Sequence, residues 1–368
     1  MKTFRRLIYK EIFYTVSFVA LSFIALFFFF DMVDELKNIG KNNSAYEFKH
    51  ALMFVVLTVP SHLYELMPIS VLIGTIFVMA RLAQSSEFTI LRTSGLGPVM
   101  ALRNLVSLGM AFTLITISVG DYVSPACDRY AKLIKSHYLK QISVGATGAW
   151  LRERQENNNY SVNIGTLTPE GNPADIRIYE FNQNGEWLAL TNAKSARVYD
   201  DSYWVLSDAE RIERAAAASQ NGMTLSRVKQ DNVVWKTSIT SEMVSVALLS
   251  PERMRTIDLF SYIRHLNDNG QATQAFEIEF WKKVFYPLSC LVMVVLALPF
   301  AYLHFRSGNI AGHVFGGVLA GISFFLLNNV FSYVGNINQW VPWFAAAAPG
   351  LLYSLASLAS FAWLVARQ

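Results

Sequence analysis

A long stretch of the chain carries no charge: residues 307–366 include no Asp, Glu, Lys or Arg. Hydrocarbon offers no water to a peptide group, so a single segment that crosses it must be a helix. Such a helix needs about 20 apolar residues, because it rises ~1.5 Å per residue. The polar sequence GNINQ at 335–339 divides the stretch into two runs of this order. The sequence therefore predicts two membrane-spanning helices here.

Four earlier runs are also mainly apolar, with Glu65 in the second and Arg103 in the third, and the chain is 53% hydrophobic and only 16% charged. The six predicted spans are residues 15–30, 51–80, 98–120, 284–303, 314–334 and 341–366. The second contains Pro60 and Pro68. Because each proline removes one backbone donor, we expect a kink near one of them.

The charged residues gather between the third and fourth spans, where 20 of the 27 acidic residues lie, from Asp121 to Glu279. The sequence DIRIYEF at 175–181 alternates as a half-buried strand does, and the Asn-Gly that follows at 184–185 is a strong hairpin signal. Further strands are expected at residues 160–164, 187–199, 203–212 and 223–237, with a turn at Asp200 and Asp201.

Many short strands with polar turns predict an all-β sandwich or roll. A helical pattern at 257–266 then leads through Gly270 into the fourth span. The expected fold class is an α-helical membrane protein with six transmembrane helices and an all-β domain inserted between helices 3 and 4. The expected divisions are residues 1–120, 121–279 and 280–368.

Basic residues on short connections mark the cytoplasmic side of a membrane protein. Here they flank the first span, the connection between the second and third, and the last spans: Lys2, Arg5, Arg6, Lys10, Arg81, Arg92, Arg103, Arg306 and Arg367. We therefore expect both termini in the cytoplasm and the β domain outside it. The first apolar run ends in FFFFD without a small-residue cleavage site, so we expect a retained anchor.

The sequence contains none of the usual constellations for catalysis or metal binding. Its Gly-Lys pair, Gly40-Lys41, lacks the rest of a nucleotide loop, and the two cysteines do not have metal-ligand spacing. His62 and Glu65 share one helical face, and we interpret them as a polar lining or an interface. Glu65 is costly in lipid and should face a cavity or a partner. We expect no cofactor, no metal and no catalysis by this chain alone. The basic residues are spread along the chain, and we expect no nucleic-acid partner.

Residues 84–95, between the second and third spans, predict a short amphipathic helix. Ser85 or Ser86 can cap its start, and Glu87 complements the positive end of its dipole. Its remaining features are apolar Phe88 and Leu91 on one face, polar Arg92, and Gly95 at the end. This helix offers both charge and apolar surface to a partner. A simple connecting helix, held by lipid headgroups, is an equally good interpretation of the pattern.

The sequence RLAQSSEFTILRTSG at 81–95 resembles the coupling-helix signature of the LptF/LptG permeases, the transmembrane subunits of the lipopolysaccharide exporter. Further stretches resemble the LptG branch more than the LptF branch: Val59-Pro60 with PISVLIG at 68–74, Trp235-Lys236-Thr237, residues 262–270, and FWKKVFYPL at 280–288. The resemblance covers the whole chain, including the position of the insert.

The resemblance implies a subunit that extracts lipopolysaccharide in the inner membrane of a Gram-negative bacterium. Its partners would be an LptF-like permease in a heterodimer, two copies of an LptB-like ATPase, and an LptC-like protein with a membrane helix and a jellyroll. The insert would be a periplasmic β-jellyroll, and the coupling position Glu87 would pair with a basic residue of the ATPase. Lys37 matches a basic cluster that meets lipopolysaccharide phosphates, and Lys41 contributes, whereas Asp31 and Asn38 depart from that pattern.

We hypothesise that spans one and five line a lipid cavity, with the phenylalanines from Phe27 to Phe30 on the tails and Lys37 near phosphate. Candidate cavity residues are Phe27, Phe30, Lys37, Lys41, Glu65 and Asn328. The alternative for the phenylalanines is bulk lipid, and for Asn328 and Asn329 it is a hydrogen bond between helices.

Two other classes of protein fit the sequence less well. Another lipid- or lipoprotein-releasing ABC permease usually has four spans with the insert after the first, whereas three spans precede the insert here. A non-transporting membrane scaffold or sensor with an outside β domain is the other alternative.

Overall fold

The computed structural model describes residues 2–40, 46–85, 87, 90, 93, 97–139, 149–155, 158–168, 172–199, 203–214, 225–240, 243–244, 251–302 and 310–366. The chain forms two compact units. The helical unit consists of Met1–Val33, Thr58–Cys127 and Gln274–Gln368, and the β unit of Asp34–Leu57 and Asp128–Thr273.

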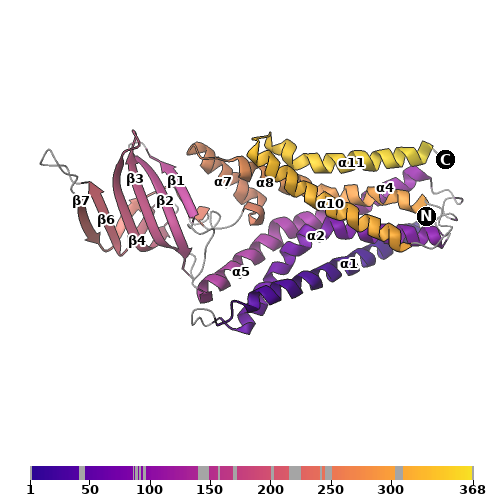
Figure 1. The fold of residues 1–368 in the computed structure, drawn as a ribbon, viewed down its shortest axis with the longest axis horizontal. Helices are drawn as coiled ribbons and strands as arrows, with labels where there is room; N and C mark the ends of the chain where they lie inside the picture. Colours follow the sequence, from indigo (N-terminus) through magenta and orange to yellow (C-terminus); the bar gives the residue numbers. More distant parts are fainter. Residues whose placement is uncertain are drawn as a thin grey trace. The chain divides into compact units, whose positions relative to one another are not determined.

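Six helical segments of the described chain are long and apolar enough to cross a membrane, and the sheet lies between the third and fourth in sequence (Figure 1). The first two segments lie in α1 (Lys2–Leu36) and α2 (Phe48–Gln84), and the last two in α10 (Ile310–Ile337) and α11 (Pro342–Ala366). The third is built from α4 (Pro98–Ser118), η2 (Val119–Val123) and α5 (Ser124–Leu139). The fourth is built from α8 (Gln274–Phe285), η4 (Tyr286–Leu288), α9 (Ser289–Leu296) and η5 (Leu298–Tyr302). The predicted combination of six apolar helices with an antiparallel sheet is confirmed.

The third and fourth helices differ from their predicted extents. Helical backbone runs past the predicted end at residue 120, through the π segment η2 into α5. The fourth helix is interrupted at η4, because Pro287 has no N–H to donate. The Thr113 hydroxyl donates to the carbonyl of Pro287 at 3.2 Å, which satisfies an oxygen at the break from a neighbouring helix.

The helix α2 forms the centre of the helical unit, and 83% of its most apolar stretch is buried. It remains one helix with both Pro60 and Pro68 inside it. At Gly74 this helix approaches α1, and an added Cβ there would lie 2.9 Å from the Cα of Val16. A small residue thus lets two backbones approach, as is common where membrane helices pack.

The β unit contains one antiparallel sheet in the order β1-β2-β3-β4-β5-β8, with β6 on β4 and β7 on β6 (Figure 1). Its strands are β1 (Ala149–Arg154), β2 (Asn158–Leu167), β3 (Pro173–Asn182), β4 (Trp187–Tyr199), β5 (Tyr203–Ser207), β6 (Ala209–Arg214), β7 (Leu225–Gln230) and β8 (Val233–Lys236). The predicted β3–β4 hairpin forms, and its turn has Gly185 at φ +81°. The expected helix after the sheet is α7 (Thr256–Asp268), followed by Gly270 at φ +64°.

The strand predicted at 203–212 is two strands, which is a correction to the sequence interpretation. Asp208 adopts φ +52° and divides β5 from β6. The long strand β4 pairs with β5 through Ser195–Tyr199 and with β6 through Ala189–Asn192. The sheet therefore forks at Asp208, with β8 continuing one branch and β7 the other.

The segment Asp34–Leu57 belongs to the β unit, where it forms buried contacts with α5. The Glu35 side chain is 5% exposed and accepts hydrogen bonds from Lys135 Nζ at 2.7 Å and the Tyr46 hydroxyl at 2.9 Å. Lys135 also lies 4.1 Å from the centre of the Phe54 ring. The end of α1, the start of α2 and α5 are thus held together.

Gly74→Ala should destabilise the helical unit, because its methyl group would meet the backbone of Val16 and force α1 away from α2. Overpacking of this kind costs about 1–3 kcal/mol. Thermal unfolding in detergent, followed by exposure of the buried thiol of Cys290, should show a lower midpoint.

Gly316→Ala is the matched control, since an added Cβ there would have no neighbour within 4 Å. Its midpoint should equal that of the wild type or lie slightly above it. Equal midpoints for both alanine variants would contradict the close α1–α2 contact.

Candidate functional site

The connection between α2 and α4 presents Glu87 to the exterior. Glu87, Ile90 and Thr93 are helical and exposed, and Ile90 is 63% exposed. The Thr93 hydroxyl donates to the carbonyl of Ile90 at 2.8 Å. The other predicted coupling residues, Phe88, Leu91, Arg92 and Gly95, lie outside the described residues. Ile90 was not singled out from the sequence, although its spacing of three from Glu87 places it on a neighbouring turn.

The helix ends beside this connection are linked to one another. Arg81, in the last turn of α2, forms an ion pair with Glu11 of α1. The Tyr9 hydroxyl of α1 donates to the carbonyl of Asn104 in α4 at 2.8 Å. Side-chain contacts thus join α1 to the ends of α2 and α4 that border the connection.

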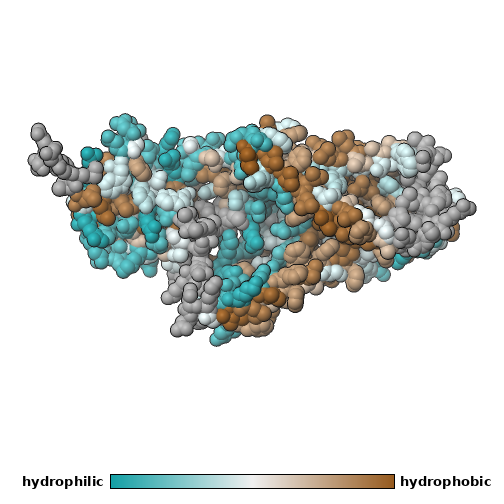
Figure 2. Space-filling model, viewed as in Figure 1, coloured by the Kyte–Doolittle hydropathy of each residue, from teal (hydrophilic) through white to brown (hydrophobic). Residues whose placement is uncertain are grey.

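Two helices leave most of their apolar surface uncovered by the rest of the chain. Only 11% of the most apolar stretch of α1 is buried, and only 22% of the most apolar stretch of α10 is buried. The exposed residues of α10 follow helical spacing along one face: Phe315, Leu319, Ile322, Leu326, Val330 and Tyr333. On α1, Phe30 is 55% exposed and Phe27 is half-buried. Figure 2 shows apolar side chains gathered over the helices and hydrophilic ones over the strands of the face in view.

An acid–histidine pair lies between α1 and α2 in the helical unit. Asp31 Oδ2 is 2.6 Å from His62 Nε2, and the Thr58 hydroxyl donates to the same oxygen at 3.4 Å. The Phe27 ring lies against His62, with 5.0 Å between ring centres. The sequence placed His62 and Glu65 on one helix face as a polar lining or an interface, and the structure adds the contact of His62 with Asp31. Among the described residues, no group of three or more His, Cys, Asp or Glu side chains could hold a metal ion.

The other predicted cavity residues have different environments. Glu65 is exposed on α2, and its backbone carbonyl accepts from the Tyr286 hydroxyl at 2.5 Å. Asn328 is buried, and its amide donates to the carbonyl of Phe324 within α10 at 3.0 Å. Lys37, directly after α1 and within the β unit, is exposed and pairs with Asp34 at 2.7 Å. Lys41 lies outside the described residues.

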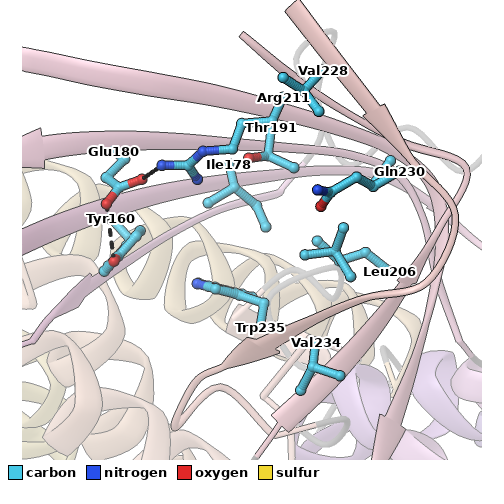
Figure 3. A pocket seen from close by; sticks show the side chains of 12 residues that line it. Tyr160, Ile178, Glu180, Thr191, Leu206, Arg211, Val228, Gln230, Val234 and Trp235 are labelled. Atoms are coloured by element: carbon cyan, nitrogen blue, oxygen red, sulfur yellow. Dashed lines mark hydrogen bonds and ion pairs between the residues drawn. The ribbon is translucent and has the colours of Figure 1, made fainter. Parts of the chain in front are cut away.

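The fork of the sheet encloses a cavity of about 150 Å³ (Figure 3). Most of its wall is apolar, formed by Ile178, Leu206, Ala209, Val228, Val233 and Val234. Glu180, Arg211, Tyr160 and Trp235 add polar groups, and Figure 3 shows the nitrogen of Trp235 on the side of the cavity where Tyr160 and Glu180 lie. The sequence interpretation missed this cavity, because the residues come from strands far apart in the chain.

Comparisons with known proteins cover almost the whole chain. The family described as "Lipopolysaccharide export system permease LptF/LptG" matches residues 6–364. The lipopolysaccharide export system permease protein LptG of Escherichia coli (strain K12) is 26% identical over 340 residues, which cover 91% of this chain and 90% of that protein. The LptG protein of Haemophilus influenzae (strain ATCC 51907 / DSM 11121 / KW20 / Rd) is 24% identical over 339 residues, with the same coverage of 91% and 90%. Since the family matches from the first span to the last, the chain belongs to the LptF/LptG family of lipopolysaccharide export permeases.

Proposed function

We propose that the chain extracts lipopolysaccharide from the inner membrane and passes it toward a periplasmic β-jellyroll bridge, as one half of an ATP-driven permease. Membership of the LptF/LptG family supports the substrate and the transport role. The observation that carries the mechanism is the uncovered apolar surface of α1 and α10, the two least buried spans.

The physical problem of such a permease is to keep acyl chains out of water. Exposing acyl chains to water costs about 0.8 kcal/mol per CH₂, so a lipid with several chains faces tens of kcal/mol. A transport route must therefore cover the tails throughout. The apolar stripes on α1 and α10 offer the tails such cover, and a second permease subunit would close the route from the opposite side.

We infer four kinds of partner from this role. An LptF-like permease forms a heterodimer with this chain, and an LptB-like ATPase dimer supplies the hydrolysis of ATP. An LptC-like membrane-anchored jellyroll protein receives the lipid with the β domain, and lipopolysaccharide is the substrate. The exposed Glu87 and Ile90 support the coupling role, because a charge and an apolar side chain stand together at the helix that would meet the ATPase.

The proposed orientation follows from the basic residues. With both termini and the connection around Glu87 in the cytoplasm, the β unit is periplasmic. In this orientation Phe27 and Phe30 of α1 contact tails near the periplasmic side, and Lys37 meets phosphate, with Lys41, Glu65 and Asn328 as further candidates. The jellyroll character of the domain is part of the proposal, and the forked antiparallel sheet supports it.

Charge reversal at the coupling helix tests the ATPase interface. In a complex reconstituted in nanodiscs, Glu87→Lys should lower ATP-dependent lipopolysaccharide release at least tenfold, because it replaces an attractive contact with the ATPase by a repulsive one. Glu186→Lys makes the same change of charge in the exposed β3–β4 turn and should leave release within twofold of the wild type. Normal assembly and release by the Glu87 variant would refute the assignment of this interface.

Photocrosslinking tests the lipid route. A photoreactive amino acid placed at Phe27, Phe30 or Lys37 should form adducts with lipopolysaccharide in cells, because these positions lie along the proposed path. The control position is Phe344, which is 45% exposed near the start of α11 and lies near the same membrane face in the proposed orientation.

Phe344 should capture at least five times less lipopolysaccharide than Phe30 does. Equal capture at both positions would mean that Phe30 faces bulk lipid. Empty crosslinks at Phe27, Phe30 and Lys37 would exclude this path.

A further inference from the structure

The helix α7 is apolar on two sides. Its inward side packs within the β unit, where Leu259, Tyr262 and Leu266 are at most 5% exposed. Directly after the helix, Asn269 Oδ1 accepts from the backbone N–H of Arg154 at 2.8 Å, which ties this end of α7 to β1. These contacts account for the attachment of α7 to the sheet. The apolar residues on its outward side therefore have another role.

The outward face of α7 combines two apolar residues with a cation. Ile257 is 68% exposed, and Phe260, almost one turn later, is 58% exposed. Arg264 follows four residues after Phe260, so it lies on the same face, and it is exposed as well. Among the described residues, none forms an ion pair with its guanidinium. An arginine of this kind can cover apolar surface with its stem and keep its charge among polar groups.

The covalent chain limits how far α7 can be from the membrane. The fourth span begins at Gln274, and only residues 269–273 separate it from the last residue of α7. Five residues extend at most about 18 Å. The polar zone on each side of the hydrocarbon is itself about 5–8 Å thick. Lipid headgroups are therefore within reach of α7.

Tryptophan residues mark the start of the fourth span as a membrane surface. Gln274 Nε2 donates to the carbonyl of Trp340 at 2.7 Å and to that of Gly335 at 3.3 Å, where α10 ends and α11 begins. Trp343, in the first turn of α11, is 48% exposed. Tryptophan is enriched where membrane helices meet water, because its ring is apolar and its N–H is polar. The ends of three spans thus meet at one interface.

We propose that the outward face of α7 binds the surface of the membrane that the chain spans. Ile257 and Phe260 enter the boundary of the acyl chains, and Arg264 meets the phosphates of anionic phospholipids. A helix that lies in the interface gains both from buried apolar area and from attraction to anionic lipids. Since the inward side of α7 stays in the β unit, the helix anchors that unit to the bilayer in addition to the chain connections.

Collision measurements on spin labels test this contact. The full chain, with Cys127 and Cys290 replaced by serine, carries one nitroxide at Ile257→Cys, Phe260→Cys or Leu225→Cys. It is reconstituted in nanodiscs of phosphatidylethanolamine and phosphatidylglycerol. Oxygen is concentrated among acyl chains, whereas a neutral nickel chelate stays in water. The ratio of oxygen to nickel collisions should be at least about fivefold higher at positions 257 and 260 than at position 225.

The control position is matched to Phe260. Leu225 is 57% exposed and belongs to β7 of the same unit, so its label samples an apolar surface position outside α7. Nickel collisions that exceed oxygen collisions at positions 257 and 260 would place the outward face in water. Few collisions with either reagent would mean that protein, not lipid, covers the face. Either result would overturn the proposal.

Arg264→Gln tests the attraction to anionic lipid. It should lower the ratio at position 260 about twofold in nanodiscs with phosphatidylglycerol and leave it unchanged in phosphatidylcholine alone, and Arg264→Lys should restore it. Arg177→Gln makes the same change on β3, where the arginine is 51% exposed, and should have no effect. Equal losses for Arg264→Gln in both nanodiscs would refute the contact with phosphate. None of these measurements uses lipopolysaccharide, so their failure would leave the transport role untouched.

Discussion

The hydrocarbon interior of a membrane gives peptide N–H and C=O groups no partner outside the protein, and the helical unit follows from this constraint. Each apolar run becomes a helix, and where one is interrupted the freed groups find partners nearby. At the break in the fourth span, the carbonyl of Pro287 accepts from the Thr113 hydroxyl of α4. Pro60 and Pro68 remain inside α2, the most buried of the spans, where neighbouring helices surround it.

The same constraint changes what an exposed apolar surface means. In water, the uncovered stripes of α1 and α10 would demand a partner, whereas in a membrane they are already solvated by lipid tails. Such a surface can exchange one set of acyl chains for another at little cost, which suits a protein that handles lipids. The polar groups are concentrated in the β unit, where Glu35 and Glu180 are buried with several donors each.

The sequence was sufficient for features that depend on local pattern. Apolar runs predicted the six helices, and Asn184-Gly185 predicted the β3–β4 turn. The sequence was insufficient where contacts between residues far apart in the chain determine the structure. The fork at Asp208 depends on β4 pairing with two different strands. His62 pairs with Asp31, which is 31 residues away on another helix. The coupling role of Glu87 stays a prediction, and the Arg211–Glu180 contact joins strands that no spacing rule connects.

The proposed transport role requires three spans on each side of a β domain that faces away from the cytoplasm. Cysteine accessibility in intact cells measures this topology directly. In a chain with Cys127 and Cys290 replaced by serine, Asn184→Cys in the β3–β4 turn should react with a membrane-impermeant maleimide added outside the inner membrane. Thr93→Cys should react only after the membrane is disrupted. Labelling of Thr93→Cys in intact cells, with Asn184→Cys protected, would invert the topology and contradict the account.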